Sequence, residues 1–192
     1  MAAVPPPQQQ KGLALTFVGP INPPATVRFR NACSAAVNDK VTHLNILFSS
    51  TGGSLDEGFS LYGFLRALPV ELTMHAIGSV ESIANVIFLA ADKRLATAES
   101  HFMFHPYAWG LLAQQYDPQQ LENYKESLRN STAKTMDILK KRTLLTDQDF
   151  GHFEFFQKLI VLPPALAQQK GIIQQIADAQ IPAGWTAWNV DF

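Results

Sequence analysis

The chain has 192 residues, of which 47% are hydrophobic and 16% charged, a size and balance that predict one compact domain able to bury its own core. The formal net charge of −1 excludes the positive surface with which proteins bind nucleic acid or anionic membranes, so neither partner is expected. The single cysteine, Cys33, excludes an intramolecular disulfide framework and is typical of a protein of a reducing compartment such as the cytoplasm.

The beginning of the chain differs in composition from the rest. Residues 1–11 are rich in proline and glutamine and include three consecutive prolines. Such a segment buries little apolar surface, so we expect a flexible arm over residues 1–12 and one folded domain over residues 13–192. We expect no secretory signal peptide, because the segment has neither a basic region nor an apolar core.

From residue 13 onward, short apolar runs alternate with segments of helical spacing. Strands are predicted at residues 13–18, 44–48, 72–77 and 101–105, and helices at residues 26–38, 55–68, 82–91 and 163–170, with another helix beginning near Thr146. The repeated strand–helix–strand order predicts a parallel sheet with right-handed crossovers, hence an α/β fold. Sites on such sheets lie at the carboxyl ends of the strands.

One predicted helix differs from the others in being long and polar. It runs from Pro118 to about Arg142, with Asp117 as its expected N-cap and proline in its first turn. It carries a large share of the charges of the chain. We therefore expect much of it to lie in water or at a boundary between subunits.

A hydroxyl group stands where a hydrolase would place its nucleophile. Ser82 directly precedes the largely apolar segment 83–91; a serine in this position is most often a helix N-cap. The N–H of Ile83 would lie in the first helical turn, where backbone donors have no helical partner and can stabilise an oxyanion. Ser79, directly after Gly78, is a rival nucleophile that we interpret as a turn residue.

A double glycine and a histidine complete the candidate site. Gly52 and Gly53 are either a simple turn or a place where the backbone approaches a ligand and Gly53 supplies a second oxyanion donor. His105, which precedes a proline at a strand end, has the near-neutral pKa of a general base and acid. His101 lies on the same strand face, but no cysteine or carboxylate pattern accompanies the two histidines, so no metal site is expected.

In order and spacing, these segments resemble the proteolytic subunit of the Clp protease, within the wider Clp-protease/crotonase superfamily. The resemblance extends over about residues 13–176. The segments that carry it are GPI at 19–21, STGGSLDEG at 50–58, GSVESIA at 78–84, ADKR at 91–94 and HFMFHP at 101–106.

The resemblance implies a repeated β-β-α (βαβ) spiral with a protruding handle helix, here within residues 108–142. It implies a serine endopeptidase without cofactor, in which Ser82 is the nucleophile, His105 the base, and the N–H groups of Gly53 and Ile83 the oxyanion hole. Residues 110–115 would form an edge strand that binds an extended peptide. The family forms stacked seven-membered rings fed by an AAA+ unfoldase, which implies a homo-oligomer that degrades unfolded protein in an ATP-dependent system.

The chain also departs from the family pattern. The family's aspartate should fall between residues 155 and 160, where this chain has no acid; Gln157 is the nearest aligned residue and a possible histidine-orienting group, and Glu154 lies about one helical turn away. A glutamine can orient an imidazole without stabilising its charge. Glu81 is unusual directly before the nucleophile and would raise the pKa of His105 if it faced the site. Residues 1–11 do not resemble the family's axial-loop segment, on which unfoldase docking depends.

Two other functions remain open at this point. A catalytically impaired paralogue with the same fold would act as a ring subunit or scaffold, a reading motivated by the missing acid and by Glu81. A crotonase-like acyl-CoA enzyme would use two backbone N–H groups to hold a thioester enolate. The pairing of Ser82 with His105 favours the peptidase over this last class.

Overall fold

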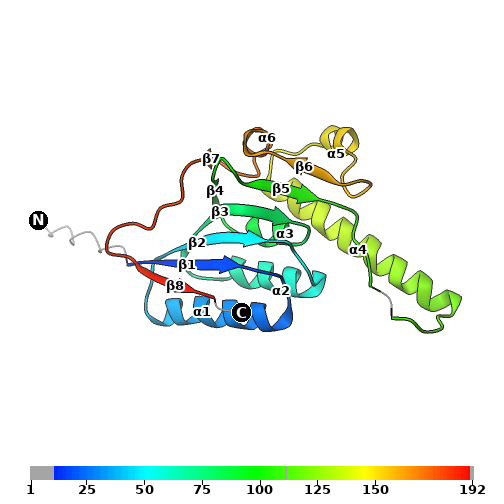
Figure 1. The fold of residues 1–192 in the computed structure, drawn as a ribbon, viewed down its shortest axis with the longest axis horizontal. Coiled ribbons are helices and arrows are strands. Elements are labelled where there is room, and N and C mark those ends of the chain that lie inside the picture. The colour runs from blue at the N-terminus through cyan, green and yellow to red at the C-terminus, as the bar shows by residue number, and fades with distance from the viewer. Residues whose placement is uncertain (1–10, 111, 191–192) are drawn as a thin grey trace, which may run out of the picture.

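The computed structural model describes residues 11–110 and 112–190, which form one sheet with helices packed around it (Figure 1). The predicted arm over residues 1–12 therefore lies almost wholly outside the described residues. Within the described residues, no helix is both long and apolar enough to cross a membrane.

Within residues 11–110 and 112–190 the sheet has eight strands, and its main path runs in the order β6-β5-β3-β2-β1-β8, with β4 joined to β3 and β7. Every pair is parallel except β5 and β6. The strands are β1 (Gly12–Val18), β2 (His43–Ser50), β3 (Glu71–Glu81), β4 (Lys93–Ala96), β5 (His101–Phe104), β6 (Ile160–Leu162), β7 (Gln175–Ile176) and β8 (Thr186–Asn189). The predicted α/β fold with a parallel sheet is confirmed.

The core lies between the sheet and the helices beneath it in Figure 1. The helices are α1 (Pro23–Asn38), α2 (Leu55–Arg66), α3 (Ala84–Phe88), α4 (Pro118–Arg142), α5 (Asp147–Phe153) and α6 (Pro164–Gln169). Alternate residues of the central strands are fully buried, and the rings of Phe17 on β1 and Phe29 on α1 lie 4.8 Å apart between centroids. The intervening residues are more polar and point to the opposite face of the sheet, where Asn45 and Thr73 are also buried.

The long polar helix occurs as predicted. α4 begins at Pro118 behind Asp117, whose side chain accepts a hydrogen bond from the N–H of Gln120 in a capping box. Only Thr135 and Leu139 are buried along this helix, and Figure 1 shows it projecting away from the sheet. The expected handle is thus a helix tied to the domain at its carboxyl-terminal half.

Three local predictions are wrong. β3 continues to Glu81, so Ser79 lies inside the strand, opposite His101, and is not a turn residue. Helix α3 begins only at Ala84 because the backbone of Ser82 is left-handed, with φ 53°. The described residues of segment 110–115 form no strand. The strands β4, β6, β7 and β8, of two to four residues each, were not predicted, since runs this short show no clear alternation.

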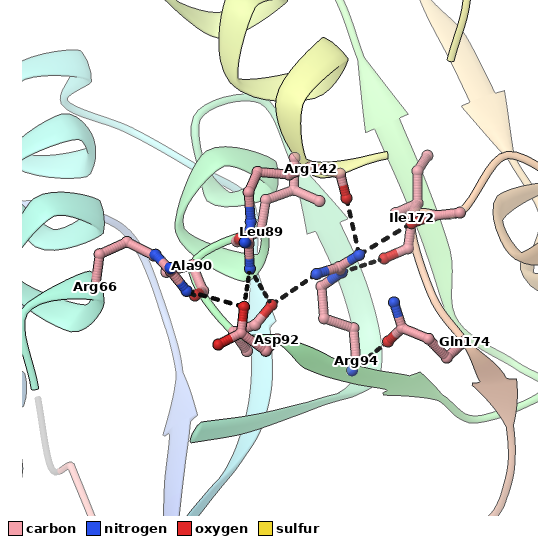
Figure 2. Close-up of polar contacts among 10 residues, drawn as sticks. Arg66, Leu89, Ala90, Asp92, Arg94, Arg142, Ile172 and Gln174 are labelled. Atoms are coloured by element: carbon pink, nitrogen blue, oxygen red, sulfur yellow. Dashed lines mark hydrogen bonds and ion pairs between the residues drawn. The ribbon is translucent and has the colours of Figure 1, made fainter. Parts of the chain in front are cut away.

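One buried arginine joins the sheet to the carboxyl-terminal ends of α4 and α6 (Figure 2). Arg94 on β4 is only 4% exposed, and its guanidinium donates hydrogen bonds to four backbone carbonyls: those of Ala91, Arg142, Gly171 and Ile172. Burial, followed by the nearby charge of Arg142, lowers the pKa of Arg94 to about 10, so the group stays charged at neutral pH. The planar guanidinium of Arg94 therefore provides hydrogen-bond donors for carbonyl groups of three chain segments at once.

This arrangement predicts that Arg94→Lys is strongly destabilising. A lysine has one nitrogen and cannot reach all four carbonyls, so the free energy of unfolding should fall by about 2–5 kcal/mol in urea titration. The neighbouring exposed residue gives the control: Lys93→Ala should change the same quantity by no more than about 0.5 kcal/mol. Equal effects of the two substitutions would contradict the structural role of Arg94.

Candidate active site

Three adjacent strands end at one place on the sheet. β2, β3 and β5 are neighbours in parallel orientation, and the residues that follow their carboxyl ends include Gly53, Ser82 and His105 respectively. A cavity of about 240 Å³ lies there, lined by Thr51, Gly53, Leu55, Ser82, His105, Tyr107 and Ala108. The topology thus brings together the three chain segments that the sequence predicts as parts of one site.

Ser82 occupies a sharp turn between β3 and α3. Its φ of 53° lies in the left-handed region, which is unfavourable for a residue with a side chain. The turn is held by a hydrogen bond of 2.9 Å from the Ser82 N–H to the carbonyl of Met103 on β5. Such strained strand-to-helix turns are the geometry by which hydrolases present a nucleophilic serine.

The double glycine packs directly against this turn. Gly52 and Gly53 have φ values of 85° and 146°, and a Cβ on Gly52 would lie 2.8 Å from the Cβ of Ser82. A Cβ on Gly53 would lie 2.2 Å from the carbonyl oxygen of Ile21. Side chains at either position would therefore push the segment away from Ser82.

Two backbone N–H groups beside Ser82 have no hydrogen-bond acceptor within residues 11–110 and 112–190. They belong to Gly53 and Ile83, although both neighbours of Gly53 are engaged: the carbonyl of Gly52 accepts from Ile21, and the N–H of Ser54 donates to Ile21, each at 2.8 Å. A backbone donor left unpaired in a native structure calls for an explanation. A ligand oxygen entering the cavity would provide the missing acceptor.

The ring of His105 is oriented by the backbone. Its Nδ1 lies 2.8 Å from the carbonyl oxygen of Pro106, which can only accept, so Nδ1 carries the proton. In the neutral ring Nε2 is then unprotonated, which is the form a general base requires. In the described part of the chain, Ser82 and His105 form no hydrogen bond with each other, although both line the cavity.

No carboxylate reaches His105 from the described residues. Gln157, the residue expected to orient the ring, is exposed and forms no hydrogen bond with it in that part of the chain. Glu154 instead forms an ion pair with Lys158. The position where a serine protease holds its acid is taken here by the Pro106 carbonyl.

Glu81 faces a different histidine from the one that sequence reasoning considered. Its carboxylate lies 3.5 Å from Nε2 of His101 on the neighbouring strand, and its side chain is 17% exposed. The carboxylate of Glu81 is thus paired with His101, beside the site, rather than with His105.

Tyr107 was missed by sequence reasoning and connects the cavity to α4. Its hydroxyl lies 2.9 Å from Oγ1 of Thr135, and because Thr135 donates to the carbonyl of Ser131, Tyr107 is the donor of this contact. Burial raises the pKa of Tyr107 to about 12. The residue stays neutral throughout the physiological pH range and links the chain after β5 to the handle.

In the described residues no group of three or more His, Cys, Asp and Glu side chains could hold a metal ion.

Comparison with known proteins identifies a family for this arrangement. The sequence matches the family model of the Clp protease over residues 29–180. No curated protein matches it. Among solved structures, a mutant of ClpP1 from Listeria monocytogenes matches with a TM-score of 0.75 over 87% of this chain and 92% of that chain, at 16% sequence identity. At this identity the likeness shows a shared fold and leaves the roles of individual residues to be argued from the geometry.

Proposed function

The chain belongs to the Clp protease family, and on this premise we propose that it is a serine endopeptidase that cleaves unfolded polypeptides. One observation carries the proposal. Ser82, in a strained turn, and His105, with a free Nε2, line one cavity together with Gly53, and the N–H groups of Gly53 and Ile83 lack acceptors in the described chain. These are the parts that acyl transfer requires.

In the proposed reaction, Oγ of Ser82 attacks the carbonyl carbon of the peptide bond while Nε2 of His105 takes its proton. The negative charge that develops on the carbonyl oxygen is stabilised by the N–H groups of Gly53 and Ile83. Collapse of the tetrahedral intermediate breaks the C–N bond, and His105 gives its proton to the leaving amine. Water then hydrolyses the acyl-enzyme by the same steps, again with His105 as base and acid.

We propose that the Pro106 carbonyl, rather than a carboxylate, orients His105. A carbonyl fixes the tautomer and direction of the ring, which is one task of the triad acid. It carries no full charge and stabilises the imidazolium less than an aspartate would. We therefore expect a functional but slow enzyme.

A second candidate function is favoured by the same missing acid. A catalytically impaired Clp-type subunit would keep the fold and serve as a ring member or scaffold. The absence of a carboxylate at His105 within the described residues is the observation that favours it. The two functions differ in whether Ser82 reacts.

Hydrolysis of a fluorogenic peptide tests the choice. The wild-type protein should cleave it, and Ser82→Ala or His105→Ala should each lower kcat by a factor of about 10³ or more. Gln157→Ala should leave kcat within about twofold, because this side chain lies away from the ring. A wild type with no activity above that of Ser82→Ala would instead favour the impaired subunit, and a large loss in Gln157→Ala would contradict the role of Pro106.

Assembly is part of the proposal. Large apolar side chains are exposed on and before the handle: Trp109, Leu112, Leu121 and Tyr124. Clustered exposed apolar residues are typical of surfaces that another subunit covers. We propose a homo-oligomer of stacked rings, acting in the cytoplasm with an AAA+ unfoldase in ATP-dependent proteolysis; this last partner rests on the family resemblance alone.

Sedimentation velocity tests the assembly. At micromolar concentration the protein should sediment as an oligomer many times the 21.2 kDa mass of the chain. Replacing Leu121 and Tyr124 by serine should shift the equilibrium toward smaller species, because exposed apolar area is removed. A single species of monomer mass for the wild type would contradict the proposal.

A further inference from the structure

The side chain of Asn85 forms an unusual contact beside the nucleophile. It lies on α3, is 2% exposed, and its Nδ2 donates two hydrogen bonds to backbone carbonyls: to Ser82 at 3.1 Å and to Met103 at 2.8 Å. The first carbonyl belongs to the strained turn and the second to β5. A single amide group therefore joins two chain segments that the site must hold together.

Each of the two carbonyls also accepts a hydrogen bond from a backbone N–H group at the turn. The Met103 carbonyl also accepts from the Ser82 N–H at 2.9 Å, and the Ser82 carbonyl also accepts from the Asn85 N–H at 3.2 Å. Met103 lies two residues before His105 on the same chain segment. The contacts thus form a closed network that fixes the nucleophile turn relative to the strand that leads to the base.

The chemistry of the contact is selective for asparagine. The primary amide offers two hydrogens on one nitrogen, as two converging carbonyls require. An ionised aspartate offers none, a serine offers one, and a glutamine places its amide one methylene too far away. The Oδ1 of Asn85 is buried without a partner among the described residues, which is unfavourable for folding. An asparagine at position 85 therefore lowers the stability of the fold, and packing alone does not explain why it is present.

We propose that Asn85 is a positioning residue that holds Ser82 in its left-handed conformation and sets its distance from His105. A non-glycine residue keeps such a backbone only when its surroundings over-determine it, and the Asn85 amide supplies two of the four hydrogen bonds that do so. The inference rests on the proposed peptidase function, because the position of Ser82 affects catalysis only if Ser82 is the nucleophile. Asn85 is not among the described residues that line the cavity, so it would act on the reaction through Ser82.

The test is Asn85→Ala, with two independent readouts. The rate of covalent labelling of Ser82 by a fluorophosphonate should fall about ten- to hundredfold, because small displacements of reacting groups have effects of this size. In peptide hydrolysis kcat should fall and KM stay unchanged. Amide hydrogen exchange at Ser82 should accelerate by about tenfold or more as its hydrogen bond to Met103 loosens.

Asn45 provides a matched control. It is also a buried asparagine whose Oδ1 has no partner in the part of the chain that the structure describes, but it contacts the carbonyl of Gln180, far from the cavity. Asn45→Ala should leave the labelling rate and the Ser82 exchange rate within about twofold of the wild type. Asn85→Ser, which keeps one hydroxyl donor, should give intermediate values and serves if the alanine variant does not fold.

The two proposals fail in different ways. If the wild type reacts with the fluorophosphonate and Asn85→Ala and Asn85→Ser react equally fast, the positioning role is overturned while the peptidase function stands. If the wild type does not react at all, the peptidase function fails, and the exchange measurement still decides the role of Asn85. Unchanged exchange at Ser82 in these variants would overturn it.

Discussion

The carbonyl oxygen of Met103 accepts hydrogen bonds from the Ser82 N–H at 2.9 Å and from Asn85 Nδ2 at 2.8 Å. These contacts exist because β3 runs past the end of β4 and continues beside β5, with Glu81 opposite Met103. A slip of this register by one residue would turn His105 to the other face of the sheet. The relative position of Ser82 and His105 is thus a property of the β3–β5 pairing rather than of either side chain.

The pairing also explains why the double glycine is needed. β2 lies on the other side of β3, so the chain leaving β2 must pass between Ile21 and the Ser82 turn. Only residues without a Cβ fit there, and their positive φ values turn the N–H of Gly53 away from Ile21. The order of the strands thus requires the two glycines, and their backbone conformation leaves the N–H of Gly53 without an acceptor among the described residues.

Much of this could be predicted from the sequence because the signals are local. The apolar runs of the inner strands and the cap at Asp117 act over a few residues, as does the occurrence of a serine before an apolar segment. The extension of β3 could not be predicted, since Gly78 and Ser79 have the composition of a turn and are held extended only by their neighbours. The contacts of Asn85 and Tyr107 join residues 18 and 28 positions apart, and nothing in the intervening sequence indicates them.

The orientation of His105 could not be predicted from the sequence for a different reason. A comparison of sequences looks for an acid near residue 157, whereas the group that meets Nδ1 is the carbonyl of the next residue. Every residue has a carbonyl, so its use leaves no trace in the sequence. His105 can therefore keep the tautomer that the aspartate of a catalytic triad would fix, although this chain has Gln157 at the expected place.

We propose that Ser82, His105 and the N–H groups of Gly53 and Ile83 form one reactive site. A crystal structure of the protein after reaction with a fluorophosphonate tests it most directly. We expect a phosphonyl group on Oγ of Ser82, with its oxygen accepting hydrogen bonds from the N–H groups of both Gly53 and Ile83. An adduct on another residue, no adduct, or a phosphonyl oxygen turned away from both donors would contradict it.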